Sequence, residues 1–158
     1  MVTFQSHSGI YTLEARQFIS CHLDEAWDFF SLPSNLSRIT PPHMGFQITS
    51  GTPSTMHPGQ IITYQVAPFP GITTNWVTEI THVSKGKYFV DEQRFGPYRM
   101  WHHEHHFEAQ DGGVLITDRV SYKLPFGFVG RIAHALFVKR QLKEIFAFRE
   151  KVLDKMFG

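Results

Sequence analysis

A chain of 158 residues can build one domain with a substantial core but is too short for two. Its 42% hydrophobic and 18% charged residues exclude a disordered chain, and a net charge of +1 gives no electrostatic argument for nucleic-acid binding. The single cysteine, Cys21, excludes an internal disulfide and fits a reducing compartment, so a cytoplasmic protein is expected. Neither a secretion signal nor about 18 consecutive apolar residues occurs, so no membrane insertion is expected.

The first third of the chain predicts one strand, two short helices and a second strand. Residues 10–19 alternate loosely, as a strand does. In residues 22–30, Leu23, Ala26, Trp27 and Phe30 form a helical stripe. Residues 35–39 allow one or two further helical turns before the prolines at 41 and 42, and residues 46–49 form a short strand.

Strand signals dominate the middle of the chain. Closely spaced strand-like runs joined by short turns favour an antiparallel meander. Asp111 and Gly112 are a strong hairpin turn signal. The predicted strands are residues 61–66, 73–83, 88–95, 101–109 and 114–124.

Residues 128–157 predict one long amphipathic helix of about 45 Å. Its apolar stripe contains Val129, Ile132, Leu136, Leu142, Ile145, Phe146, Val152, Leu153 and Met156. This helix is the one predicted element large enough to cover a sheet with a single buried face. The sequence therefore predicts an α+β domain over residues 1–158, with a curved seven-stranded antiparallel sheet wrapped around the C-terminal helix.

The strand at residues 101–109 has an unusual inner face. Strand periodicity places Trp101, His103, His105 and Phe107 on one side. The other side carries the polar residues His102, Glu104, His106 and Glu108. A purely structural core strand would normally carry Val, Ile or Leu on its inner face. The aromatic and imidazole mixture instead indicates the wall of a pocket.

A turn at Asp111 and Gly112 pairs this strand with residues 114–124. It sets His105 opposite Asp118 and Trp101 opposite Tyr122. Because an unpaired buried carboxylate is costly, Asp118 needs a partner, and His105 is placed to supply one.

The turn before this strand leaves two alternatives. A three-residue loop over residues 96–98 sets Asp91 opposite His103 and Gln93 opposite Trp101, all facing inward. A two-residue loop would point Asp91 and Gln93 outward. We prefer the first because Phe89 shares their face and needs burial. Two acid–imidazole pairs, Asp91 with His103 and His105 with Asp118, then lie side by side.

Three interpretations of these pairs stay open. They could satisfy buried polar groups and fix the register, present hydrogen bonds to a ligand, or perform acid–base chemistry. The catalytic candidates are His105, Asp118 and His103. A His-x-His pair is a weak metal signal and both carboxylates already have partners, so neither a metal nor a cofactor is expected.

The chain resembles the SRPBCC superfamily, which includes START domains, plant pathogenesis-related allergens and bacterial polyketide cyclases. Within it, the chain more closely resembles a group of small bacterial ligand-binding SRPBCC domain proteins. The most specific matching motif is Gly-Pro-Tyr-x-x-Trp-x-His-x-His-x-Phe at residues 96–107. The other matching segments are residues 27–30, 35–36, 39–42, 89–93, 118–122 and 124–127. The resemblance implies a helix-grip fold with a hydrophobic ligand cavity, and some relatives carry a cell-division-inhibitor label.

We therefore expect a protein that binds a small apolar or aromatic molecule, lipid-like or polyketide-like, between the sheet and the last helix. The alternatives are a cyclase, dehydratase or hydrolase that uses an Asp-oriented histidine, and a partner-binding regulator of the cell-division-inhibitor kind. The aromatic side chains of the last helix cannot all face inward, and some of them, among Phe137, Phe146 and Phe148, could mark a homodimer surface or a cavity entrance. The expected ligand-binding residues are Trp76, Phe89, Asp91, Gln93, Trp101, His103, His105, Asp118 and Tyr122.

Overall fold

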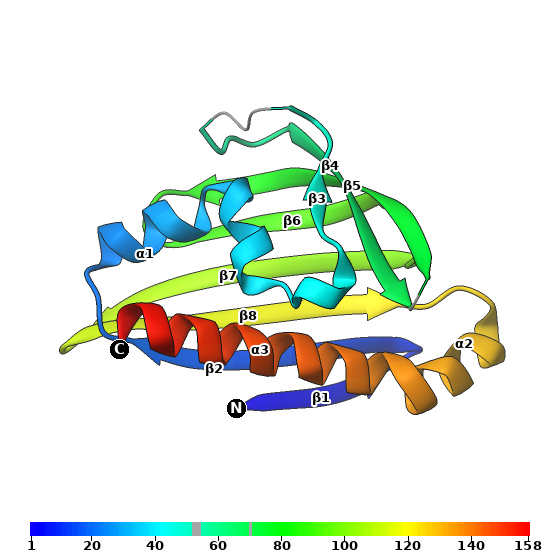
Figure 1. Cartoon of the computed structure of the whole chain (residues 1–158). Helices are drawn as coiled ribbons and strands as arrows, with labels where there is room; N and C mark the ends of the chain where they lie inside the picture. Colours follow the sequence, from blue (N-terminus) through cyan, green and yellow to red (C-terminus); the bar gives the residue numbers. More distant parts are fainter. Residues whose placement is uncertain (52–54, 70) are drawn as a thin grey trace.

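The protein is an eight-stranded antiparallel sheet with a long C-terminal helix across one face (Figure 1). The computed structural model describes residues 1–51, 55–69 and 71–158. The strand order is β1-β2-β8-β7-β6-β5-β4-β3, so the last strand, β8, pairs with β2 of the first hairpin. The strands are β1 (Val2–His7), β2 (Ile10–Ile19), β3 (Gln47–Ile48), β4 (Gln60–Phe69), β5 (Ile72–Ser84), β6 (Tyr88–Phe95), β7 (Met100–Gln110) and β8 (Gly113–Lys123).

The helices lie in two groups. The first group follows β2, and the second ends the chain and runs along β2 and β8 (Figure 1). The first group is α1 (Leu23–Phe30) and the 3-10 helices η1 (Pro33–Ile39) and η2 (Pro42–Met44). The second group is α2 (Gly127–Ala133), the π-helical turn η3 (His134–Val138) and α3 (Lys139–Phe157). None of the helices in the described ranges combines the length and the apolar character that a bilayer-spanning segment requires.

The predicted sheet lacked one strand. Strand β1 pairs with β2 from Val2 opposite Ala15 to His7 opposite Ile10. Ser8 and Gly9 both have positive φ values, 54° and 76°, which is the backbone of a two-residue hairpin turn. The Ser-Gly dipeptide was the sequence signal for this turn. The strand itself gives a weak hydrophobic pattern, because the outward residues of this edge strand are polar.

The register predicted for the central hairpin is confirmed. Trp101 lies opposite Tyr122, His105 lies opposite Asp118, and the turn is formed by the two residues between Gln110 and Gly113. Asp91 lies opposite His103, as the inward-facing alternative required. The loop that produces this register spans the four residues between Phe95 and Met100, one more than predicted.

The sheet curves because strand β5 is irregular against β6. The pairing shifts between Val77 and Thr78 and again between Ile80 and His82. Extra residues of this kind bend a strand and increase its twist. The bend makes a concave inner face, and α3 runs along β2 and β8 on one side of it (Figure 1).

The last helix is interrupted, and its first part does not cover the sheet. The inward residues are Gly130, His134, Val138, Leu142, Phe146, Arg149 and Leu153. The predicted stripe is therefore wrong for Val129, Ile132 and Leu136, which are exposed. The π-helical turn η3 separates α2 from α3, and α2 extends past the end of the sheet (Figure 1).

Candidate functional site

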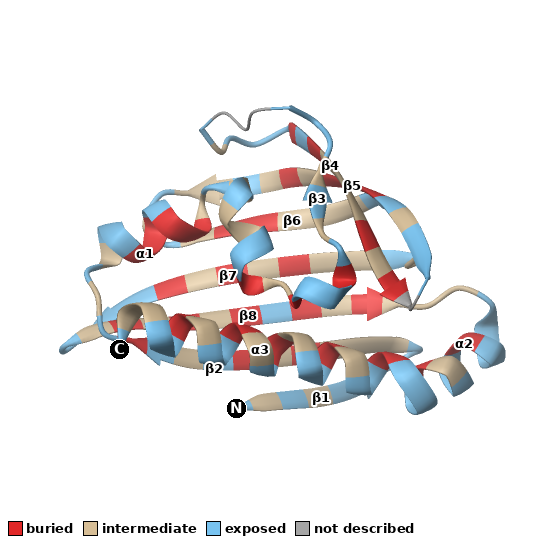
Figure 2. Cartoon of the chain, viewed as in Figure 1, coloured by how far each residue is buried: buried red, intermediate tan, exposed pale blue. Residues whose placement is uncertain are grey.

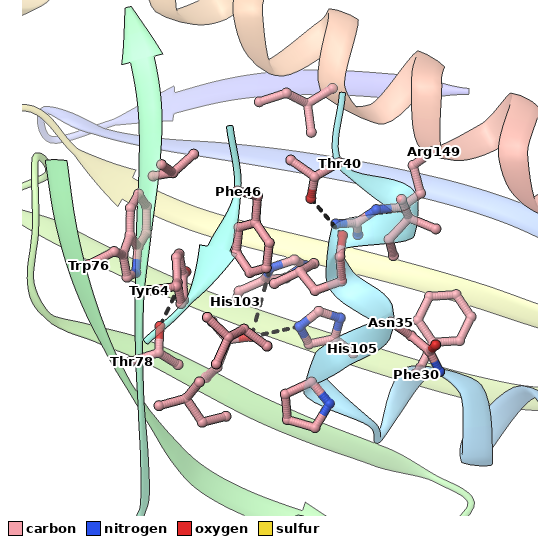
Figure 3. A pocket seen from close by; sticks show the side chains of 18 of the residues that line it. Phe30, Asn35, Thr40, Phe46, Tyr64, Trp76, Thr78, His103, His105 and Arg149 are labelled. Carbon is pink, nitrogen blue, oxygen red and sulfur yellow. Dashed lines mark hydrogen bonds and ion pairs between the residues drawn. The ribbon is translucent and has the colours of Figure 1, made fainter. Parts of the chain in front are cut away.

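A cavity of about 180 Å³ lies between the concave face of the sheet and helix α3. Strands β4 to β7 form one wall, η1, η2 and β3 form another, and α3 closes the third side (Figure 3). Most of the wall is aliphatic or aromatic. The polar residues that line it include Asp91, His103, His105 and Arg149.

The structure brings six of the nine expected ligand-binding residues to this wall. They are Trp76, Phe89, Asp91, Trp101, His103 and His105. The other three lie elsewhere. Asp118 lies behind the imidazoles, Tyr122 is fully buried in the core with its hydroxyl 2.7 Å from His134 Nε2, and Gln93 holds the turn after β6.

The Gln93 side chain forms its hydrogen bonds within a local turn. Its amide nitrogen donates to the Tyr98 carbonyl at 2.6 Å, and its amide oxygen accepts from the Tyr98 backbone N–H at 3.1 Å. These two bonds fix the residues that lead into β7. Gln93 therefore positions the strand that carries the imidazoles.

Five charged or titratable side chains form one buried network at the cavity wall. His103 Nε2 lies 2.8 Å from Asp118 Oδ1, and His105 Nε2 lies 2.7 Å from Asp91 Oδ2. Arg149 Nη1 donates to the same Asp118 oxygen at 3.3 Å. Ionised carboxylates only accept hydrogen bonds, so both imidazoles donate through Nε2. The network therefore joins β6, β7, β8 and α3.

The shortest bonds differ from the predicted acid–imidazole pairs. Each imidazole bonds to the carboxylate diagonal to it instead of the one directly opposite. The predicted partners remain close, with His103 Nδ1 3.9 Å from Asp91 and His105 Nδ1 3.1 Å from Asp118. Stacking explains the change, since the rings of His103 and His105 lie 3.7 Å apart and Phe89 stacks on His105 at 4.1 Å.

Both carboxylates are held in the ionised form. Burial alone would raise the pKa of Asp91, but the hydrogen bond from His105 and the nearby positive charges outweigh it and lower that pKa. Burial also acts against ionised Asp118. The charge of Arg149 and the hydrogen bonds from the imidazoles nevertheless hold the pKa of Asp118 well below its usual value.

The pKa values of the two imidazoles shift in opposite directions. Burial, together with the neighbouring charge of His105, lowers the pKa of His103. Burial also opposes a charge on His105, but its contacts with Asp118 and Asp91 outweigh burial and raise its pKa. The arrangement favours a His105 imidazolium and a neutral His103. Two carboxylates are then balanced by two cations, Arg149 and His105.

Three buried nitrogens of the cavity wall have no hydrogen-bond partner within the described part of the chain. They are the indole N–H of Trp76, Nε of Arg149 and Nδ1 of His105, the last of which lies 3.1 Å from Asp118 without hydrogen-bond geometry. A buried polar group without a partner costs about 1–3 kcal/mol. An oxygen atom inside the cavity could accept a hydrogen bond from such a group.

The same residues are the candidate metal ligands. One ligand atom from each of Asp91, His103 and His105 falls within a 4.8 Å cluster. However, the short bond from His105 to Asp91 occupies a nitrogen and an oxygen that a metal would need. The raised pKa of His105 also means that a proton must leave before a cation binds. The geometry favours proton retention over metal coordination.

The sequence argument missed Arg149, whose charge balances Asp118. A signal was present, because Arg149 falls between Phe146 and Leu153 at helical spacing in the buried stripe. A second residue that the sequence argument did not place in the core is His134. It is buried, stacked on Tyr11 at 3.6 Å and bonded to the Tyr122 hydroxyl.

A protein-family model described as "Polyketide cyclase / dehydrase and lipid transport" matches residues 19–147, most of the chain. The chain belongs to this SRPBCC family. The predicted resemblance and helix-grip fold are therefore confirmed. The comparison with curated proteins found no match.

Solved structures share the fold of this SRPBCC protein at low sequence identity. Protein Ms6760 from Mycobacterium smegmatis has a TM-score of 0.68 and 16% identity, covering 99% of both chains. TTHA0849 from Thermus thermophilus has a TM-score of 0.69 and 13% identity, covering 91% of this chain and 94% of its own. Major latex-like protein 151 from Panax ginseng has a TM-score of 0.68 and 12% identity, covering 94% of this chain and 98% of its own.

Proposed function

We propose that this SRPBCC protein binds a compact, mostly apolar molecule that carries at least one oxygen acceptor. The observation that carries the proposal is an apolar cavity whose wall holds a buried, unpartnered Trp76 N–H beside a charged network. Binding would give that donor an acceptor while the aromatic walls bury the rest of the molecule.

The cavity volume narrows the class of ligand. An apolar cavity of about 150 Å³ in another protein holds benzene. A cavity of about 180 Å³ therefore suits a molecule with one or two rings better than an extended fatty acid. The family's polyketide and lipid connection is consistent with a cyclic ligand of this size.

Removing the indole donor is expected to reduce selectivity for oxygen-bearing ligands. The probes are 2-naphthol and naphthalene, which differ in one hydroxyl group. The protein is expected to bind 2-naphthol more tightly by about twofold to tenfold, the contribution of one hydrogen bond. Trp76→Phe is expected to reduce that preference while retaining naphthalene binding, as measured by fluorescence titration.

Trp27→Phe is the matched control, because Trp27 is buried in the core next to Phe107 and does not line the cavity. It should preserve the preference for 2-naphthol. Native mass spectrometry of protein purified from cells should also reveal a bound small molecule. Failure to bind either probe, together with no carried molecule, would reject the proposal.

Acid–base catalysis is a second candidate, favoured by the His105 imidazole, which lines the cavity, lies between the carboxylates of Asp91 and Asp118 and has a raised pKa. It predicts that His105→Ala abolishes turnover of a cyclisable or hydrolysable ligand while affinity changes little. Mass spectrometry of the ligand before and after incubation is the measurement. Recovery of every bound ligand unchanged by the unmodified protein would reject catalysis and leave binding.

A further inference from the structure

The segment before α3 exposes an unusual number of large apolar side chains. We call residues 126–137 the apolar arm. Its large apolar side chains are 52% to 80% exposed, and Figure 2 shows the arm at the end of the sheet. They are Phe126, Phe128, Val129, Ile132, Leu136 and Phe137. Contiguous exposed apolar surface of this kind usually marks an interaction site.

The arm presents these side chains on one face. Phe128, Ile132 and Leu136 follow one another at four-residue spacing, as residues on one helix face do. The opposite face is buried through Gly130 and His134. Fraying of the helix therefore does not explain the exposed face, because the other side of the same helix is buried in the core.

Backbone geometry also keeps an aromatic ring outside the core. Phe126 has a φ of 67°, a left-handed conformation that is strained for a bulky residue. The residue is 80% exposed, so burial of its ring does not offset the strain. A contact made outside this chain would account for an aromatic side chain at this position.

A cationic hollow of about 300 Å³ adjoins the arm. Arg99, Lys123 and Arg131 line it, and none of them forms an ion pair within the described part of the chain. Its other lining residues are Ser8, Gly9, Tyr11, Leu124 and Gly127. The hollow thus places three free cations next to the exposed rings that flank Gly127.

The charge pattern identifies the partner. The sequence from residue 119 to residue 143 contains no Asp or Glu. A second copy docked by two-fold symmetry would bring the two cationic hollows close together, which like charges oppose. We propose that the apolar arm docks the protein onto an anionic phospholipid membrane. The rings would enter the headgroup and acyl boundary, and the hollow would take a lipid phosphate.

The arm continues directly into the helix that lines the cavity. Gln141, which lines the cavity at the start of α3, donates a hydrogen bond to the Pro68 carbonyl at the end of β4. Gln141 follows the arm closely in the sequence, so the arm is joined to the end of the cavity that Gln141 lines. The docking inference does not rest on the proposed ligand binding, because the arm and the hollow lie outside the cavity.

Vesicle flotation tests the inference. One set of vesicles contains phosphatidylcholine alone, and the other is an equal mixture of phosphatidylcholine and phosphatidylglycerol. The protein is expected to float with the mixed vesicles, less so at high salt. Since each basic residue near an anionic surface contributes about fivefold in binding, the triple variant Arg99→Gln, Lys123→Gln, Arg131→Gln should bind about 100-fold more weakly.

The apolar contribution needs its own variant and control. Phe126→Ser with Phe128→Ser should abolish flotation, whereas Ile61→Ser, at an exposed apolar position on β4, should not. Lys151→Gln with Lys155→Gln is the charge control on α3. Circular dichroism checks that each variant is folded.

Four outcomes would overturn docking. They are no flotation with mixed vesicles, equal flotation with both vesicle types, binding of inorganic phosphate without vesicle binding, and a dimer in light scattering that the Phe126 and Phe128 changes convert to monomers. Loss of naphthol binding with flotation intact would reject only the proposed function.

Discussion

Arg149→Met is expected to lower the free energy of unfolding by about 3–5 kcal/mol, because it leaves the buried carboxylate of Asp118 without its main cationic partner. Methionine keeps most of the side-chain volume, so the loss would report the charge and not a cavity. Urea denaturation followed by tryptophan fluorescence measures it.

Two further variants separate charge from packing in this experiment. Arg140→Met removes an exposed arginine from the same helix, and its pair with Glu144 should contribute about 0.5 kcal/mol or less. The double variant Arg149→Met with Asp118→Asn should recover part of the loss, because the unpaired charge disappears with its partner. A loss below about 1 kcal/mol for Arg149→Met would contradict the charge-balance account.

Periodicity and turn chemistry predicted the part of the site that lies in the sheet. Side chains alternate at a fixed period of two, so a turn at Asp111 and Gly112 leaves a single register that buries Ile116 and Val120. The same register decides which residues oppose His103 and His105. For this reason the sequence predicted which residues oppose both imidazoles, although Asp118, expected at the cavity wall, lies behind them.

Hydrogen-bond choice within the network was not predictable in this way. Two carboxylates lie within reach of two imidazoles, and register does not distinguish a direct pair from a diagonal one. Ring stacking between His103 and His105, and of Phe89 on His105, makes that choice, and it depends on side-chain rotation. Arg149 reaches the network from a different element, so only the fold brings it to Asp118.

The apolar stripe of the last helix failed as a predictor for a physical reason. Hydrophobic periodicity marks a face that leaves water, but it does not state what covers that face. Leu142 and Phe146 face the sheet, whereas Ile132 and Leu136 follow the same pattern beyond the end of the sheet. The surroundings of the helix change at the π-helical turn η3. The apolar residues after this turn pack in the core, whereas those before it stay exposed and available to a partner.

The same buried network contributes both to the stability of the fold and to the polarity of the cavity wall. Asp91, His103, His105 and Arg149 line the cavity, and Asp118 holds two of them from behind. A ligand that lies against this wall meets groups that are already oriented, which reduces the ordering cost of binding. The protonation of the two imidazoles therefore decides which donors the cavity presents.

His105→Gln and His103→Gln are expected to affect stability with opposite pH dependence. The pKa of His105 is raised in the folded protein, so its contribution is fully present below the unfolded pKa of about 6.5 and is lost as pH rises through the folded pKa. The pKa of His103 is lowered, so its contribution is present above about pH 6.5 and is lost as pH falls through the folded pKa. The facing charges of Asp91, Asp118 and Arg149 stay constant in this range, because the carboxylate pKa values are lowered and arginine stays protonated.

The destabilisation caused by His105→Gln should therefore be largest near pH 5 and shrink toward pH 9, while that caused by His103→Gln should grow over the same range. Each tenfold change in proton affinity between folded and unfolded states contributes about 1.4 kcal/mol. Urea midpoints in a pH series measure both effects, with His82→Gln as an exposed control of the same chemistry. Parallel curves for the two buried positions would mean that the network does not hold one imidazole charged and the other neutral. It would then act as an uncharged hydrogen-bonded cluster whose cavity offers the same donors at every pH.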